Sequence, residues 1–254
     1  MRILLNGIGG FMGREVVRAA ENGYANATVV GGIDLCAEGA GDIPFASDFA
    51  RAEELFPAGT ADCLIDFSHH SCTEALLDFA VKTRTPLVLA TTGHTEEELA
   101  AVARAAKHIP IFHSANMSLG VALLVKLAKE AARAMPDAEI EIVEKHHDRK
   151  IDAPSGTAMM LFRELQEVRP QATAVLGRGG QGKRTPDEIG IHAIRMGNIV
   201  GEHEVILCTN SQSITLKHEA YSRSLFADGA LSAAVFLVKQ TAGLYDMHDL
   251  LREN

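Results

Sequence analysis

The stretch RILLNGIGGFMG, residues 2–13, decides the fold of this 254-residue chain. Its apolar start predicts a buried strand, and a helix running to Ala20 is expected directly after the glycines. Gly7 allows a tight turn, while the missing side chains at Gly9 and Gly10 let the backbone approach a pyrophosphate. The N-terminus of the helix presents N–H groups and a positive dipole end to that phosphate. The stretch predicts a dinucleotide-binding turn, and a glycine turn that serves helix–strand packing alone remains the alternative.

An acidic residue follows the second predicted strand, Thr28–Ile33. Asp34 lies about 20 residues beyond the glycines, where a dinucleotide fold places the acid that binds the ribose. Its carboxylate can accept hydrogen bonds from both ribose hydroxyls and would repel a 2′-phosphate. Leu35 and Cys36 supply no arginine for that phosphate. The pattern therefore favours NADH over NADPH.

The first half of the chain alternates short apolar segments with helical patterns. Further strands are expected at 63–67, 86–90 and 109–112, with helices at 72–81 and 96–107. Strand–helix–strand units with this spacing form right-handed crossovers. The predicted fold class is therefore α/β, with a doubly wound parallel sheet of the Rossmann type.

The pattern changes after Asn116. A predicted helix at 121–134 leads into EIEIVE at 139–144, whose period-two alternation is typical of a strand with one exposed face. The glycine-rich stretch Gly177–Lys183 is expected to be a mobile loop. Further strands are expected at 189–196, 204–208 and 213–217. These features predict a smaller mixed α/β domain.

We therefore expect two domains. Residues 1–117 and 224–254 would form the dinucleotide-binding domain, because the apolar final helix is expected to pack back on the first half. Residues 118–223 would form a substrate-binding and oligomerisation domain. Closure about hinges near Asn116 and Arg223 would bring the two sites together and exclude water.

The composition argues against several classes of function. Basic residues number 24 and acidic residues 33, a formal charge of −9, which disfavours nucleic-acid binding and a polybasic membrane anchor. Neither a signal peptide nor a membrane span is expected, so we predict a cytoplasmic location. The histidine pairs at 69–70 and 146–147 lack further ligands at metal spacing, so no metal is expected. No CxxC pair occurs, and free thiols are expected. The cysteines are Cys36, Cys63, Cys72 and Cys208.

The densest polar chemistry lies at 144–157, EKHHDRKIDAPSGT. The alternating strand ends here and a helix begins near Ser155, so N–H and hydroxyl donors stand near Lys150. Such donors suit a small carboxylate. His146 and His147 titrate near neutrality and can deliver a proton. The segment predicts a site for an anionic substrate that is protonated during reaction; a solvated loop with Ser155 as a helix N-cap remains the alternative.

Six motifs follow one another along nearly the whole chain. They are GIGGFMG at 7–13, ATTG at 90–93, SANMSLG at 114–120, HHDRKIDAPSGT at 146–157, GNIVGEH at 197–203 and FADGA at 226–230. In this order they resemble the motifs of the 4-hydroxy-tetrahydrodipicolinate reductase (dihydrodipicolinate reductase) family. The stretch DAPSGTA at 152–158 is the most diagnostic of them.

This resemblance implies a homotetrameric NAD(P)H-dependent oxidoreductase of lysine and diaminopimelate biosynthesis. It would reduce 4-hydroxy-tetrahydrodipicolinate, through dihydrodipicolinate, to tetrahydrodipicolinate. By matching position, His146 and Lys150 would be the catalytic proton donors, and His147, Gly156 and Thr157 would bind the carboxylates of the substrate. The residues implied to bind the cofactor are Gly7, Ile8, Gly9, Gly10, Phe11, Met12, Asp34, Ala90, Thr91, Thr92, Ser114, Ala115, Asn116 and Met117.

Two positions depart from the pattern of this family. Asp34 stands where members may carry Glu, without the basic residue that often follows, and Phe11 stands where many members carry Arg. Both departures weaken the case for NADPH and leave NADH open.

Two other functions remain open at this point. The chain could be another two-domain NAD(P)-dependent dehydrogenase of a small carboxylate, or a non-catalytic protein that senses a dinucleotide. A sensor would not need a proton donor beside a carboxylate receptor, so His146 and Lys150 favour an enzyme.

Overall fold

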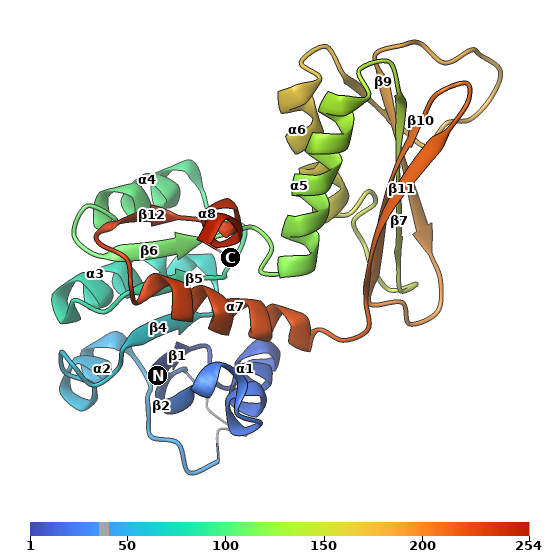
Figure 1. Cartoon of the computed structure of the whole chain (residues 1–254). Coiled ribbons are helices and arrows are strands. Elements are labelled where there is room, and N and C mark those ends of the chain that lie inside the picture. The colour runs from blue at the N-terminus through green and yellow to red at the C-terminus, as the bar shows by residue number, and fades with distance from the viewer. Residues whose placement is uncertain (36–40, 254) are drawn as a thin grey trace. The chain divides into compact units, whose positions relative to one another are not determined.

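The chain forms two compact units, each with its own sheet. The computed structural model describes residues 1–35 and 41–253, so Cys36 lies outside the described residues. One unit comprises Met1–Leu119 and Arg223–Asn254, and the other comprises Gly120–Ser222 (Figure 1). Within these described ranges, no helix combines the length and apolar character needed to cross a membrane.

A seven-stranded sheet forms the centre of the first unit, in the order β12-β6-β5-β4-β1-β2-β3. Every strand pair in it is parallel. The central strands are buried on both faces, as their continuous apolar sequences predict. The predicted doubly wound parallel sheet is thus confirmed. The strands are β1 (Arg2–Asn6), β2 (Thr28–Ile33), β3 (Phe45–Ala46), β4 (Cys63–Asp66), β5 (Leu87–Leu89), β6 (Pro110–His113) and β12 (Gly243–Tyr245).

Helices cover both faces of this sheet (Figure 1). On one face, α2, α3 and α4 bury aliphatic and aromatic side chains against alternate strand residues such as Leu4 and Leu64. On the other face, α1 and α7 pack together, and Phe236 of α7 meets Phe112 of β6 with ring centroids 6.1 Å apart. The helices are α1 (Phe11–Glu21), η1 (Tyr24–Asn26), α2 (Phe49–Leu55), η2 (His70–Cys72), α3 (Thr73–Thr83), α4 (Glu96–Ala105), α7 (Ser224–Leu237) and α8 (Met247–Glu253).

The second unit contains a five-stranded mixed sheet, in the order β11-β10-β7-β9-β8. Its central strand β7 is antiparallel to β10 and parallel to β9. Helices α5 and α6 cover one face through an aliphatic core, while ion pairs such as Lys145–Glu202 line the other. The expected mixed sheet with one open face is confirmed. The elements are α5 (Leu119–Ala134), β7 (Glu139–His146), α6 (Gly156–Val168), β8 (Thr173–Leu176), β9 (Glu188–Arg195), β10 (Gly201–Cys208) and β11 (Ser213–Ala220).

Seven short elements are not predicted by the sequence patterns: α2, β3, β8, β12, α8 and the 3-10 turns η1 and η2. Helix α2 has seven residues and begins after Asp48, whose side chain accepts the N–H of Arg51 at 2.7 Å. Strands β3 and β12 have two and three residues, too few for a period to show. Elements of this length depend on packing against neighbours rather than on their own sequence. The glycine-rich stretch 177–183 joins β8 to β9 without regular structure, and its mobility stays a prediction.

Candidate active site

The glycine turn lies between β1 and α1. Gly7 has a φ of +83°, and a Cβ there would lie 2.6 Å from the carbonyl oxygen of Phe67. A Cβ at Gly13 would lie 2.2 Å from the carbonyl oxygen of Gly7, so α1 starts directly against the turn. Gly10 is the N-cap residue, Met12 is half-buried, and the first turn of the helix carries no acidic residue. The turn therefore offers backbone N–H groups and the positive end of a helix dipole to a phosphate.

Asp34 lies beside this turn. It follows β2 directly, and its Oδ2 accepts a hydrogen bond from the N–H of Gly9 at 2.9 Å. Ile8 is fully buried beneath the turn. The ring of Phe11 is half-exposed, and the Arg223 guanidinium carbon lies 5.7 Å from its centroid, a cation–π geometry. The residues expected at the phosphates and the ribose thus lie side by side.

The residues expected on the nicotinamide side follow β5 and β6 at the carboxyl edge of the sheet. Leu89 and His113 end these strands in register, so the segments 90–92 and 114–117 begin at neighbouring positions. Helix α7 packs closely on the second segment, since a Cβ at Gly229 would lie 1.7 Å from the carbonyl oxygen of Met117. Ala90, Thr91 and Met117 are buried, Ser114 and Asn116 are half-buried, and Thr92 and Ala115 are exposed.

A buried carboxyl group at this edge is missing from the sequence-based set. Asp66 ends β4 and is 1% exposed; it accepts hydrogen bonds from Asn6 Nδ2 at 2.7 Å and from Ser68 Oγ at 2.6 Å. Burial raises the pKa of Asp66, and these hydrogen bonds oppose the rise. The available signal was an acid inside the apolar strand CLID, because a buried carboxyl group requires polar partners.

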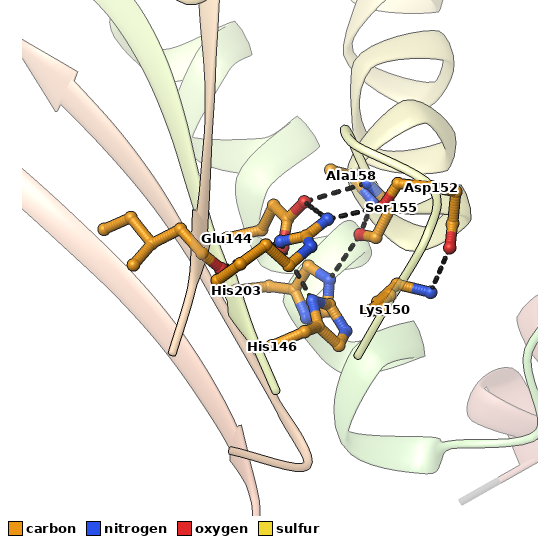
Figure 2. A network of polar contacts seen from close by, with 9 residues as sticks. Glu144, His146, Lys150, Asp152, Ser155, Ala158 and His203 are labelled. Carbon is orange, nitrogen blue, oxygen red and sulfur yellow. Dashed lines mark hydrogen bonds and ion pairs between the residues drawn. The ribbon is translucent and has the colours of Figure 1, made fainter. Parts of the chain in front are cut away.

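In the second unit, β7 carries Glu144 and His146 on its buried face. Glu144 is fully buried and accepts hydrogen bonds from both terminal nitrogens of Arg195 at 2.8 Å, from His146 Nδ1 at 2.6 Å and from the N–H of Ser155 at 2.9 Å (Figure 2). Burial alone would raise the pKa of Glu144, but these hydrogen bonds outweigh it and lower the pKa to about 2. The group is therefore a carboxylate at neutral pH, and Nδ1 of His146 must donate to it.

His203 of β10 packs its ring on that of His146, with centroids 5.2 Å apart. It is 4% exposed, and its Nε2 lies 3.2 Å from the Oγ of Ser155. Burial, helped by the nearby charge of His146, lowers the pKa of His203 to about 3, so this imidazole is neutral. Gly201 lies two residues before His203 on β10, and a Cβ there would lie 3.1 Å from Nε2 of His146. Glycine at this position therefore keeps space open beside that nitrogen.

The expected carboxylate receptor lies at the start of α6. Ser155 is the N-cap residue and accepts the N–H of Ala158 at 3.2 Å, and Gly156 and Thr157 begin the helix. Lys150 lies 2.7 Å from the carboxylate of Asp152. The charge of Lys150 contributes to lowering the pKa of His203, so Lys150 and the histidines belong to one site (Figure 2).

The structure thus brings His146 and the N-cap residue of α6, Ser155, into contact with Glu144. His147, directly after β7, is half-buried. The sequence missed Glu144, Arg195, His203 and Asp152, of which Glu144 could have been found from its place in the alternation of β7. Among residues 1–35 and 41–253, no group of three or more His, Cys, Asp or Glu side chains could hold a metal ion.

Family models match both halves of the chain. The model described as "Dihydrodipicolinate reductase, N-terminus" matches residues 1–117, and "Dihydrodipicolinate reductase, C-terminus" matches residues 120–251. A 4-hydroxy-tetrahydrodipicolinate reductase of Caldanaerobacter subterraneus subsp. tengcongensis is 46% identical over 255 residues, covering 100% of this chain and 99% of that protein. One of Clostridium perfringens is 39% identical over 257 residues, with the same coverage.

Solved structures share the fold. A dipicolinate-bound dihydrodipicolinate reductase from Paenisporosarcina superposes with a TM-score of 0.80 at 24% identity, covering 97% of each chain. A DAP dehydrogenase of C. glutamicum in complex with DAP superposes with a TM-score of 0.59 at 14% identity, covering 99% of this chain and 95% of that one. At these identities the superpositions establish the architecture alone.

Proposed function

Because the chain belongs to the dihydrodipicolinate reductase family and, as an NAD(P)H-dependent oxidoreductase, reduces 4-hydroxy-tetrahydrodipicolinate, we propose that His146 donates the proton and Lys150 supports this reaction. The family membership supersedes the two other functions that the sequence left open. The observation that carries the residue assignment is the 2.6 Å hydrogen bond between His146 and the buried carboxylate of Glu144. That bond lies beside the N-terminus of α6, where an anion is favoured.

The residues of the first unit fit a dinucleotide. A Cβ at Gly7 or Gly13 would collide with backbone, and the N-cap residue of α1, Gly10, has no side chain, so the turn suits a pyrophosphate. We assign Gly7–Met12 to the phosphates, Asp34 to the ribose, and the segments 90–92 and 114–117 to the nicotinamide side. When bound, the reduced nicotinamide supplies a hydride.

The chemistry of the substrate sets the tasks of the second unit. Loss of the 4-hydroxyl as water leaves a conjugated imine, whose C4 accepts hydride, and the resulting enamine takes a proton at the neighbouring ring carbon to give the imine product. Gly156, Thr157 and His147 would bind the carboxylates of the ring, one of which would also lie at Lys150. Lys150 would stabilise the negative charge that grows during hydride transfer.

His146 is arranged to deliver that proton from Nε2. Glu144 accepts the Nδ1–H, which fixes the orientation of the ring. Nε2 faces the space that Gly201 leaves open. His203, kept neutral by burial, adds no second positive charge next to His146.

We further propose that Asp34 makes NADH the preferred cofactor. Its carboxylate already accepts the N–H of Gly9, so it is fixed where two ribose hydroxyls would approach, and a 2′-phosphate would meet its charge. Asp34→Ala should raise the KM for NADH by about 10-fold, the loss of one or two hydrogen bonds to a charged group, with a smaller rise for NADPH. Steady-state kinetics with both cofactors measures the ratio, and an unchanged ratio would remove Asp34 from the ribose site.

We also propose a homotetramer in the cytoplasm. The open face of the sheet in the second unit, with Lys145, Lys217 and their glutamate partners, supports assembly through this face. The biosynthetic activity of the named relatives supports the location.

A coupled assay tests the function as a whole. The substrate would be made in place from pyruvate and aspartate semialdehyde by its synthase, and the absorbance of reduced nicotinamide would be followed with NADH and with NADPH. Cofactor oxidation that depends on the synthase is expected. No oxidation with either cofactor would contradict the assignment.

A further inference from the structure

The donors assigned to a substrate carboxylate already hold a carboxylate of the chain itself. Asp152 Oδ1 lies 2.7 Å from Nζ of Lys150 (Figure 2). The backbone of Gly156, the first residue of α6, also donates a hydrogen bond to the side chain of Asp152. A cation and a helix N-terminus are the two features expected to attract a carboxylate of the substrate.

We propose that Asp152 is an internal stand-in for one substrate carboxylate, which the incoming dicarboxylate replaces at Lys150 and Gly156. The inference rests on the proposed function, because it takes these donors as the substrate's own. Binding is then an exchange of one carboxylate for another.

The geometry makes this exchange inexpensive in free energy. The side chain of Asp152 is 55% exposed and that of Lys150 is 23% exposed. Ion pairs with one partner this exposed contribute little to stability, because water competes for both charges. The carboxylate of Asp152 can therefore turn into solvent without a large loss.

The backbone keeps the stand-in close to its donors. A guanidinium nitrogen of Arg195 donates to the carbonyl oxygen of Asp152, and the same guanidinium holds the buried carboxylate of Glu144. The hydrogen bond to Lys150 is the largest cause that lowers the pKa of Asp152, so the group is ionised at neutral pH. Asp152 thus competes with every anion that enters, and a ligand anchored by a second carboxylate is favoured over one without it.

Two other roles of Asp152 predict different effects of its removal on dicarboxylate binding. If Asp152 stayed on Lys150 in the complex and only oriented the ammonium group, its removal would weaken binding of a dicarboxylate. If Asp152 acted only through its negative charge, another acid on the same loop would act alike. Asp148 is such an acid: it is exposed and pairs with Arg149 at 2.9 Å, whereas Lys150 pairs with Asp152.

Calorimetry with pyridine-2,6-dicarboxylate separates these roles. This planar dicarboxylate does not react, and it would be titrated into the full chain saturated with oxidised cofactor. Asp152→Asn should bind it about two- to five-fold more tightly than the wild type, the range expected for removing an exposed ion pair. Asp148→Asn should change the Kd by less than two-fold. Unchanged or weaker binding by Asp152→Asn, or an equal gain in Asp148→Asn, would overturn the proposal.

A crystal structure of the wild-type complex gives a second readout that needs no variant. With the ligand bound, the carboxylate of Asp152 should lie farther than 4 Å from Nζ of Lys150, with a ligand carboxylate in its place. An intact Lys150–Asp152 pair would contradict the exchange. Failure of the wild type to bind the dicarboxylate would count against the proposed substrate site itself, whereas binding without gain in Asp152→Asn overturns the stand-in alone.

Discussion

On each face of the five-stranded sheet, a glutamate of β7 binds one histidine and one arginine. We call these two groups the inner trio, on the buried face, and the outer trio, on the open face. On the buried face, Glu144 binds His146 and Arg195. On the open face, Glu141 binds His192 at 2.8 Å and also pairs with Arg184. The carboxylate of Glu144 is fully buried, whereas the side chain of Glu141 is 29% exposed.

The comparison shows that surroundings, rather than residue types, give such a trio its chemistry. A buried carboxylate interacts with its partners through a low dielectric and cannot be re-solvated when one partner leaves. An exposed one exchanges its partners for water at little cost. Only the inner trio also binds the N–H of Ser155, the N-cap residue of α6, and so contacts the proposed carboxylate site.

The largest expected difference between the trios is in turnover. His146→Gln should lower kcat by about 10²- to 10⁴-fold, the usual contribution of a positioned general acid, with a small change in the Kd for pyridine-2,6-dicarboxylate. His192→Gln, in the outer trio, should leave kcat within two-fold. The coupled assay measures both variants. A near-normal rate in His146→Gln would show that another group donates the proton.

The next difference is in stability. Glu144→Gln leaves the half-buried guanidinium of Arg195 without its anion and places an amide at a fully buried position, so it should lower the free energy of unfolding by about 3–5 kcal/mol. Glu141→Gln should cost about 1 kcal/mol or less. Urea titration measures both. Equal losses of stability in the two variants would break the comparison.

The smallest effect is on the pH dependence of stability. It comes from His203, whose ring packs on His146 of the inner trio. Its pKa falls from 6.5 in the unfolded chain to about 3 in the folded state, so the folded form binds fewer protons and loses stability as pH drops below 6.5. Between pH 6.5 and 5 this loss should be about 2 kcal/mol. The window lies above the range, from about 4.5 down to about 2, in which Glu144 titrates.

His203→Gln should remove this part of the slope, and His192→Gln should keep it. The measurement is the free energy of unfolding by urea at several pH values from 7 to 5. Parallel slopes for the wild type and His203→Gln would show that His203 is not held neutral in the fold.

The sequence predicts most of this arrangement for a physical reason. The apolar segments of the first unit predict its parallel sheet, and the alternation of β7 predicts a half-exposed strand. The same alternation places Glu144 and His146 on the face of Ile140 and Ile142, so a buried acid next to a histidine was available as a signal.

The partners from other strands could not be predicted in this way. Pairing of β7 with β9 sets Arg195 opposite His146, and pairing with β10 sets His203 opposite Glu144. Arg195 lies 49 positions from His146 in sequence, and His203 lies 59 positions from Glu144. A one-residue change in strand register would turn them to the other face. The packing of the whole sheet fixes the strand register, and the register is difficult to predict from a single sequence.

The close packing of α7 on Met117 has a practical consequence for anyone re-engineering cofactor use. Gly229 has no room for even a methyl group, so a mutant library aimed at the 114–117 segment should hold that glycine constant. Helix α7, near the end of the chain, supports the 114–117 segment. Shortening the chain into this helix to simplify expression would remove the packing partner of that segment.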